Sequence, residues 1–355
     1  MMKVLIAMSG GVDSSVAAKL LCYEGYECIG CTMKLYDNCD AGLPRGRTCC
    51  SLDDVEDARS VAFSIGMRYY VFNFKDDFHE KVIKKFASGY LRGQTPNPCI
   101  DCNRYMKFDK LFERAKLLGC DKIATGHYAR IEFDGEKYRL KKALDKSKDQ
   151  SYVLYMLTQE QLAHALFPLG SLHKTDTRAI ADTAGLSSAH KPDSQDICFV
   201  PDGDYAAAIE RLAGIKAPCG NFIDASGKVI GTHRGITHYT VGQHRGLVLS
   251  LPERRYVCSI DAENSTVTLG GSDELYSSTA EVRGFNWISG ETPAEPIRCT
   301  AKIRYRQPEQ PATAIAHKDG SITIQFDSPQ RAVTPGQAAV LYDGDTVLGG
   351  GEIVR

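Results

Sequence analysis

Residues 3–15 read KVLIAMSGGVDSS, and this stretch decides the fold. Its apolar run, residues 3–8, stops at a Ser-Gly-Gly turn, which is typical of a buried strand in a parallel sheet. Apolar side chains at helical spacing follow in residues 14–23. A strand, a glycine-rich turn and a helix in this order predict the first βα unit of an α/β protein.

The turn at residues 9–15 has the composition of a phosphate-binding loop. Its two glycines let the backbone approach a phosphate closely and tolerate positive φ angles. The helix that follows would offer N–H groups and the positive end of its dipole to an anion. The three serines add hydroxyl donors, and the carboxylate of Asp13 is a candidate Mg²⁺ ligand. The turn matches neither a Walker loop nor a GxGxxG loop, and a plain capped strand–helix turn is the less favoured alternative.

Strands and helices continue to alternate up to residue 125, which predicts a parallel sheet. Strands are expected at residues 27–35, 69–74 and 122–125, and helices at 51–66, 107–118, 158–166, 176–184 and 204–212. Asp134-Gly135 predicts a hairpin turn. Residues 95–103 are expected to form a loop, because two prolines flank Asn97.

The last third of the chain has a different sequence pattern. Short β-rich runs are separated by turn pairs at Ser226-Gly227, Glu263-Asn264, Asp319-Gly320 and Asp343-Gly344. This pattern is typical of hairpins in a small barrel or sandwich. The length of 355 residues corresponds to ~2.4 domains. We therefore expect a domain at residues 1–203, a small mixed domain at 204–273 and a β-domain at 274–355.

Composition excludes several classes of protein. Hydrophobic residues make up 43% and charged residues 25%, which excludes a disordered chain, a collagen and a disulfide miniprotein. A net charge of −1 means that any nucleic-acid contact must come from a local patch. No apolar run is long enough to span a membrane and no signal peptide is recognisable, so a cytoplasmic location is expected. In that compartment, the 13 cysteines favour metal, redox or nucleophilic roles over structural disulfides.

Two cysteines stand in positions suited to chemistry. A thiol reacts as the thiolate, so a reactive cysteine needs accessibility and positive neighbours. Cys102 lies in the proline-rich segment, two residues from Arg104, and Cys198 follows the turn-prone residues 190–193. The alternative is that both are buried structural thiols.

A series of motifs carries a resemblance to a known family. SGGVDSS at residues 9–15 is similar to the pyrophosphate loop of the PP-loop ATP pyrophosphatases, which cleave ATP between the α and β phosphates and adenylate an oxygen. Six further motifs occur in order: TPNPCIDCN (95–103), TGHYAR (125–130), KDQSY (148–152), DICF (196–199), TVGQHRGL (240–247) and KIRYRQ (302–307). Together they resemble the tRNA-specific 2-thiouridylases (MnmA type) over nearly the whole chain.

The resemblance implies a fold and a reaction. The fold is a parallel-sheet PP-loop domain (adenine nucleotide α-hydrolase-like), then a small mixed middle domain and a C-terminal β-barrel. ATP with Mg²⁺ would adenylate O2 of the wobble uridine of tRNA and release pyrophosphate. A persulfide sulfur carried on Cys198 would attack C2, and Cys102 would then release the sulfur by closing a disulfide with Cys198 as AMP leaves. A sulfur-donor protein, either a cysteine desulfurase or a relay, would load the persulfide.

The resemblance also implies two sets of binding residues. The set for ATP consists of Ala7, Met8, Ser9, Gly10, Gly11, Val12, Asp13, Ser14, Met33 and Gly126. The set for tRNA consists of Asn97, Pro98, Cys99, His127, Lys148, Asp149, Gln150, Arg304, Tyr305 and Gln337. Residues 97–99 would lie near the target base, which must leave its stack for chemistry at C2.

One position departs from the pattern of some family members. Cys99 stands where they carry an acid/base Asp, so residues 99–102 form a C-x-x-C motif. With Cys198, these thiolates would offer three ligands to a 4Fe–4S cluster with one open iron. A redox pair or a zinc half-site remain alternatives. Cys39, Cys49 and Cys50 bracket one loop, where either zinc or incidental thiols are possible readings.

Two basic segments are candidates for RNA contact. Residues 137–148 carry six cations and one acid, although on charge alone a solvated hairpin is the better reading. If residues 302–306 form a strand, alternation puts Lys302, Arg304 and Arg306 on one face. The competing functions are a PP-loop adenylating ligase acting on another substrate and a binding protein without turnover.

Overall fold

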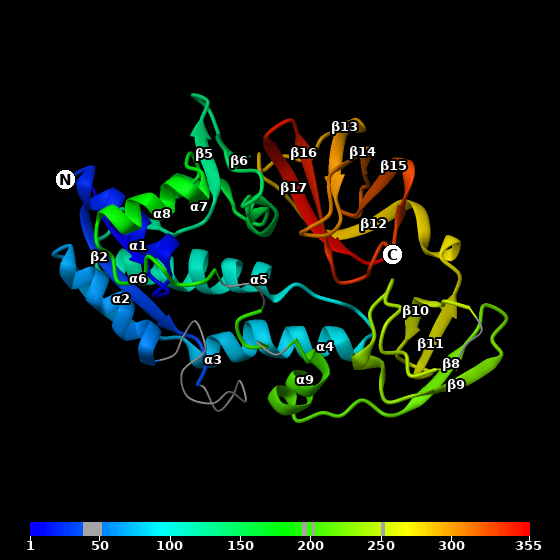
Figure 1. Cartoon of the computed structure of the whole chain (residues 1–355). Helices are drawn as coiled ribbons and strands as arrows, with labels where there is room; N and C mark the ends of the chain where they lie inside the picture. The colour runs from blue at the N-terminus through cyan, green and yellow to red at the C-terminus, as the bar shows by residue number, and fades with distance from the viewer. Residues whose placement is uncertain (38–51, 194–196, 201–202, 250–252) are drawn as a thin grey trace.

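The computed structural model describes residues 1–37, 52–193, 197–200, 203–249 and 253–355. Three regions follow one another along the chain: a parallel sheet covered by helices, a small four-stranded sheet and a C-terminal barrel (Figure 1). Within the described ranges, no helix is both long and apolar enough to cross a membrane.

The N-terminal sheet contains the predicted βα units. Its parallel strands have the order β3-β2-β1-β4-β7. They are β1 (Lys3–Ala7), β2 (Glu27–Lys34), β3 (Arg68–Asn73), β4 (Lys122–Ala124) and β7 (Ala165–Leu166). In the central strand, Leu5 packs into one core cluster, whereas Val4 and Ile6 pack into the other. Burial on both faces explains the unbroken apolar run of β1 and confirms the α/β prediction.

Helices supply both core clusters. The cluster around Val4 takes residues from α1 (Val12–Tyr23), α2 (Leu52–Ser64) and α8 (Lys174–Thr183). The cluster around Leu5 takes residues from α4 (Lys84–Leu91) and from the helix at residues 98–117. Shorter helical elements are α3 (Lys75–Phe78), η1 (His79–Ile83), η3 (Ser151–Leu154), α7 (Gln159–His164), α9 (Tyr205–Ala213), η4 (Ile236–His238) and η5 (Asp273–Leu275).

The prediction of a loop at residues 95–103 is wrong from residue 98 onward, where the chain is helical. A helix that we call the thiol helix begins at Pro98 and runs through α5 (Pro98–Asp101), the π-helical η2 (Cys102–Lys110) and α6 (Leu111–Leu117). Proline is tolerated at the first helical position, where its missing N–H would have no helical partner. Asn97 caps this helix, because its side chain accepts a hydrogen bond from the Cys99 N–H.

The structure also confirms the predicted C-terminal β-barrel. Six strands close through the pairing of β12 with β17, in the order β12-β15-β14-β13-β16-β17. They are β12 (Tyr276–Trp287), β13 (Ile297–Lys302), β14 (Gln310–Ala316), β15 (Ile322–Arg331), β16 (Ala338–Asp343) and β17 (Thr346–Ile353). The predicted hairpin, β5 (Ala129–Phe133) and β6 (Tyr138–Lys142), extends this sheet beyond β17 (Figure 1). The hairpin therefore joins the first region to the barrel.

The middle region is a sheet of four strands in the order β10-β11-β8-β9. They are β8 (Gly220–Ile223), β9 (Val229–His233), β10 (Tyr256–Asp261) and β11 (Thr266–Gly270). All four predicted turn pairs of the last third connect consecutive strands, two of them in this sheet and two in the barrel. Helix α4 reaches this region from the N-terminal sheet, where it contacts α9 and η4 (Figure 1).

The prediction that residues 302–306 form a strand with three cations on one face is wrong. Strand β13 ends at Lys302, and the chain then turns. Arg304 points inward and donates to the carbonyls of Val241 and Ala332 at 3.0 and 3.1 Å. Because the strand stops, alternation no longer places Lys302, Arg304 and Arg306 on one face.

Candidate active site

Two glycines, one in the loop between β1 and α1 and one after β4, allow close contacts around this loop. Gly10 has a φ of +73°, and a Cβ there would lie 2.5 Å from the Asp54 carbonyl oxygen. A Cβ on Gly126 would lie 2.8 Å from the Ser14 nitrogen. Residues 9–15, which we call the glycine loop, are therefore held between the first turn of α2 and the segment after β4.

Serine hydroxyls shape the glycine loop from within. Ser14 and Ser15 each donate to the Gly11 carbonyl, at 3.1 and 2.9 Å, and the Ser9 N–H donates to Ser14 Oγ at 3.1 Å. The hydroxyls of Ser14 and Ser15 thus bond to the loop itself instead of standing ready for a phosphate. Gly11 provides no side-chain cap for α1, so the first N–H groups of this helix suit an anion.

Asp13 belongs to a charge network that the sequence did not reveal. Its Oδ1 accepts hydrogen bonds from Lys174 Nζ at 2.6 Å and from the Tyr128 hydroxyl at 2.9 Å. Lys174 also pairs with Asp193 at 2.9 Å. Asp193 in turn binds Lys148 and Arg178, both at 2.8 Å. Partial burial opposes ionisation of Asp193, but hydrogen bonds from Lys148 and Lys174 lower its pKa to about 2.

The 148–152 motif packs against the segment after β4. The Tyr128 N–H donates to Gln150 Oε1, and the Gln150 N–H donates to the Tyr128 carbonyl, both at 2.9 Å. Asp149 accepts from the Ala143 N–H at 2.9 Å and from the Ser151 hydroxyl at 2.8 Å. The structure therefore brings the two motifs together beside the glycine loop, with Lys148, Asp149 and Gln150 engaged in intramolecular contacts.

Cys102 lies at the point where α5 passes into the π-helical segment. Both Cys102 and Cys198 are partly buried and pack against the core cluster of Leu5. The backbone carbonyl of Cys198 accepts a hydrogen bond of 2.8 Å from the Tyr36 hydroxyl. Burial raises the pKa of the Cys102 thiol, the positive charge of Lys107 lowers it, and the negative charge of Asp101 raises it.

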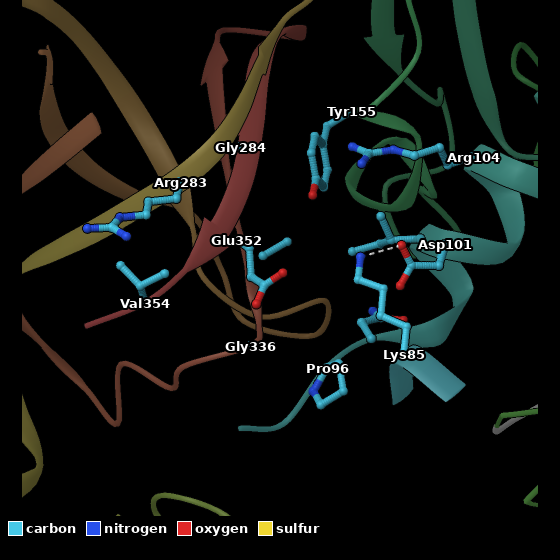
Figure 2. Close-up of a pocket in the computed structure, with 13 residues that line it drawn as sticks. Lys85, Pro96, Asp101, Arg104, Tyr155, Arg283, Gly284, Gly336, Glu352 and Val354 are labelled. Carbon is cyan, nitrogen blue, oxygen red and sulfur yellow. Dashed lines mark hydrogen bonds and ion pairs between the residues drawn. The ribbon is translucent and has the colours of Figure 1, made fainter. Parts of the chain in front are cut away.

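The predicted positive neighbour of Cys102 is not Arg104. The Arg104 side chain extends toward Tyr155, into a cavity of about 240 Å³ between the thiol helix and the barrel (Figure 2). Asp101 lies at the edge of this cavity and pairs with Lys85 at 2.7 Å. Asn97 and Pro96 line the same cavity. The sequence did not single out Lys107, because residues five apart do not share a face of an ordinary α-helix.

Cys99 is exposed on the first turn of the thiol helix. Among the described residues, no group of three His, Cys, Asp or Glu side chains is arranged to hold a metal ion. Cys99, Cys102 and Cys198 therefore do not present a preformed ligand set for an iron–sulfur cluster. Cys39, Cys49 and Cys50 lie outside the described residues, so the zinc reading is not addressed there.

His127 is buried instead of lying open to a partner. Its Nδ1 lies 2.7 Å from Thr125 Oγ1, and its Nε2 lies 3.3 Å from Lys107 Nζ. The ring meets Phe167 edge to face. Burial and the charge of Lys107 hold the pKa of His127 well below its usual value, so the ring is neutral.

The barrel residues named by the resemblance meet the segment before the thiol helix. Gln337 donates to the Thr95 carbonyl at 2.5 Å, and the Thr95 N–H donates to the Pro335 carbonyl at 2.8 Å. Lys302 lies over the ring of Tyr305, whose hydroxyl donates to the Asp149 carbonyl at 3.3 Å. These contacts connect the barrel to both the thiol helix and the 148–152 motif.

The basic segment 137–148 is largely neutralised within the protein. Its ion pairs are Lys137–Glu291, Arg139–Asp134, Lys141–Glu132, Lys142–Glu309 and Lys148–Asp193. This arrangement agrees with the reading of the segment as a solvated hairpin. It gives no support to a continuous patch of bare cations.

Comparisons with known proteins cover nearly the whole chain. The family model described as the tRNA methyl transferase HUP domain matches residues 2–202. The tRNA methyl transferase PRC-barrel domain matches residues 212–271, and the aminomethyltransferase beta-barrel domain matches residues 277–353.

Curated relatives match over nearly their full length. The tRNA-specific 2-thiouridylase MnmA of Acetivibrio thermocellus is 51% identical, over 99% of both chains. The tRNA-specific 2-thiouridylase MnmA 2 of Caldanaerobacter subterraneus subsp. tengcongensis is also 51% identical, over 99% of this chain and 98% of that protein. The MnmA of Clostridioides difficile is 48% identical with the same coverage.

Proposed function

The chain belongs to the family of tRNA-specific 2-thiouridylases, and from this premise we propose that it uses ATP to replace the C2 oxygen of the wobble uridine of tRNA by sulfur. One observation carries the proposal. Cys102 and Cys198 are far apart in the sequence, yet both pack against the core cluster that contains Leu5 of β1, the strand that leads into the glycine loop. The strand that leads into the loop proposed to bind ATP therefore shares one core cluster with the two proposed catalytic thiols.

The glycine loop would bind the phosphates of ATP. The first N–H groups of α1 would face the phosphates, and Lys174, which pairs with Asp13, would add a donor beside them. Bound Mg²⁺ would offset phosphate charge during adenylation. Asp13 fits as its ligand only through Oδ2, since Oδ1 already accepts hydrogen bonds from Lys174 and Tyr128. Gly126 lets the segment after β4 approach the glycine loop closely.

Sulfur transfer would follow in balanced steps. Attack of uridine O2 on the α-phosphate releases pyrophosphate and leaves an adenylated base. The terminal sulfur of a Cys198 persulfide then bonds to C2, and AMP leaves with the former O2. The Cys102 thiolate attacks the Sγ of Cys198, which breaks the sulfur–sulfur bond, releases 2-thiouridine and leaves a Cys102–Cys198 disulfide. An external dithiol must reduce this disulfide before the next cycle.

The remaining parts of the proposal concern partners and domains. The wobble uridine would lie near residues 97–99, and the tRNA would also contact Tyr305 and Gln337. His127 and Arg304, which bond within the protein, would support this surface from inside instead of touching the tRNA. A cysteine desulfurase or a relay protein would deliver the sulfur. Residues 1–203 would bind ATP and carry both thiols, while residues 204–273 and 274–355 would hold the tRNA. The substrates, ATP and tRNA, favour a cytoplasmic location.

The described residues around the two thiols do not fit an iron–sulfur cluster. Cys99 is exposed, whereas Cys102 is partly buried, and the described residues around them offer no third ligand in reach. The persulfide scheme needs only the two thiols that the structure packs on one core. Anaerobic reconstitution with iron and sulfide, followed by absorption spectroscopy, tests the cluster alternative directly.

The decisive experiment is nucleoside mass spectrometry. Unmodified tRNA is incubated anaerobically with the protein, ATP, Mg²⁺ and a persulfide donor, which is a cysteine desulfurase supplied with free cysteine. We expect 2-thiouridine together with AMP and pyrophosphate. AMP without 2-thiouridine under these conditions would favour an adenylating ligase for another substrate. Failure to form either product with folded protein would contradict the proposal.

A further inference from the structure

The π-helical segment changes which side chain lies beside Cys102. In η2 (Cys102–Lys110), backbone hydrogen bonds run from residue i to residue i+5, so residues five apart are about one turn apart. Cys102 and Lys107 have this spacing. In an ordinary α-helix, residues three and four apart share a face, and Lys107 would point elsewhere. The π-helical segment thus brings a cation toward the thiol.

Lys107 differs from the other lysines of this neighbourhood. Lys110, on the same helix, pairs with Asp77 and Glu113, and Lys85 pairs with Asp101. In the described part of the chain, no carboxylate lies within ion-pair distance of Lys107. Its ammonium group instead lies 3.3 Å from Nε2 of His127. The positive charge near the thiol is therefore not neutralised by a neighbour.

The His127 ring fixes the direction of the Lys107 side chain. Because the ring is neutral, Nε2 can accept a hydrogen bond from the ammonium group while Nδ1–H donates to Thr125 Oγ1. Edge-to-face packing against Phe167 and a tilted contact with Phe108 hold the ring in place. A buried ring held on three sides is a rigid support for the ammonium group.

We propose that Lys107 is a positioning residue for the sulfur chemistry, in which the neutral ring of His127 aims its ammonium group so that it stabilises the thiolate of Cys102. The inference rests on the proposed function of Cys102. Lys107 does not take the proton, which passes to water. Its charge stabilises the anion that remains, and the burial of Cys102 makes this stabilisation stronger than it would be in water.

The other charges near Cys102 come from three elements. Asp101, adjacent to Cys102, opposes the thiolate and is itself paired with Lys85 of α4. His127, after β4, is neutral. Arg104 extends into the cavity toward the barrel (Figure 2). Lys107 therefore lowers the pKa of the Cys102 thiol, and Asp101 raises it. Substitutions of the two residues should shift this pKa in opposite directions, which general misfolding would not do.

The test is the pH dependence of Cys102 alkylation in the full-length protein. Iodoacetamide modification is followed by peptide mass spectrometry, which reports Cys102 separately from the other cysteines. For Lys107→Met, we expect the rate profile to move to higher pH by about one unit, the size typical of a nearby charge. For Asp101→Asn, we expect a move to lower pH. Lys110→Met removes a cation from the same helix and should leave the profile unchanged.

His127 and conservative variants complete the experiment. His127→Leu should move the profile in the same direction as Lys107→Met, and Lys107→Arg should largely restore it. Lys107→Gln replaces Lys107→Met if the latter does not fold, as judged by circular dichroism. An unchanged profile in folded Lys107→Met or Lys107→Gln overturns the inference, whatever the thiolation activity. Thiolation that persists in Cys102→Ala overturns the proposed function instead, so the two failures are distinguishable.

Discussion

The glycine loop and the thiol helix are built in opposite ways. The glycine loop is continuous in the sequence, and its backbone groups and serines produce its shape. The thiol helix works through partners from elsewhere: His127 follows β4, Lys85 lies on α4 and Cys198 lies far along the chain. The N–H groups proposed to bind phosphate come from one local stretch of sequence, whereas the charges that tune a thiol are brought together by tertiary structure.

The largest expected effect separates the two regions. Cys102→Ala and Cys198→Ala should each lower tRNA thiolation at least about a thousandfold, because a covalent step is lost. Pyrophosphate release should persist in both variants, because adenylation precedes the two thiol steps and the glycine loop is intact. Mass spectrometry of nucleosides and a coupled assay of pyrophosphate measure the two outcomes. Cys258→Ala, a change in β10 of the middle region, should leave both reactions unchanged. Single-turnover thiolation by both thiol variants would contradict the persulfide scheme.

The second prediction compares two adjacent glycines. Gly10→Ala places a Cβ 2.5 Å from the Asp54 carbonyl at a φ of +73°, which should lower the free energy of unfolding by about 3 kcal/mol. Gly11→Ala is the matched control, because its Cβ would meet only Ser9 Oγ, at 3.5 Å. Urea unfolding measures both variants. Equal stability of the two would mean that the glycine loop does not pack on α2 as described.

The third prediction concerns Asp193. Lys174 pairs with both Asp193 and Asp13 and so links the two carboxylates. The folded pKa of Asp193, about 2, lies below the ordinary 3.8, so its ionised form stabilises the fold above the ordinary value. That stability is lost as pH falls from about 4 toward 2. Asp193→Asn should therefore lower the free energy of unfolding at pH 7 by about 2 kcal/mol.

The pH dependence provides the check on this network. Urea unfolding gives the free energy of unfolding of Asp193→Asn and of the unsubstituted protein at each pH. The difference between these two free energies should become smaller as the pH falls below 4. Asp182→Asn, which removes a mostly exposed carboxylate on α8, should have little effect at any pH. A pH-independent difference would mean that Asp193 acts through packing instead of charge.

The contrast between local sequence and tertiary contacts also explains which features can be predicted from the sequence. Periodicity and turn residues predicted the parallel sheet, the hairpin at Asp134-Gly135 and the β-rich last third, because these depend on neighbouring residues. The start of the thiol helix is not predicted because proline usually breaks a helix, although Pro98 occupies the first helical position and Asn97 caps the helix. Lys107, Lys174 and Asp193 were missed because their partners come from other elements, and nothing in the local pattern encodes those pairings.

The smallest expected effect concerns the basic hairpin, where cations adjacent in the sequence pair with carboxylates of the hairpin and the barrel. Lys137 binds Glu291, and Lys141 binds Glu132. Because exposed ion pairs already satisfy these charges, Lys137→Gln and Lys141→Gln should each change the Kd for tRNA less than about twofold. Filter binding at several salt concentrations measures this. A phosphate contact at either residue would instead weaken binding and lower the salt slope by about one. In that case tRNA would have to break the Glu291 or Glu132 pair, and the hairpin would be a binding surface that exchanges internal carboxylates for phosphates.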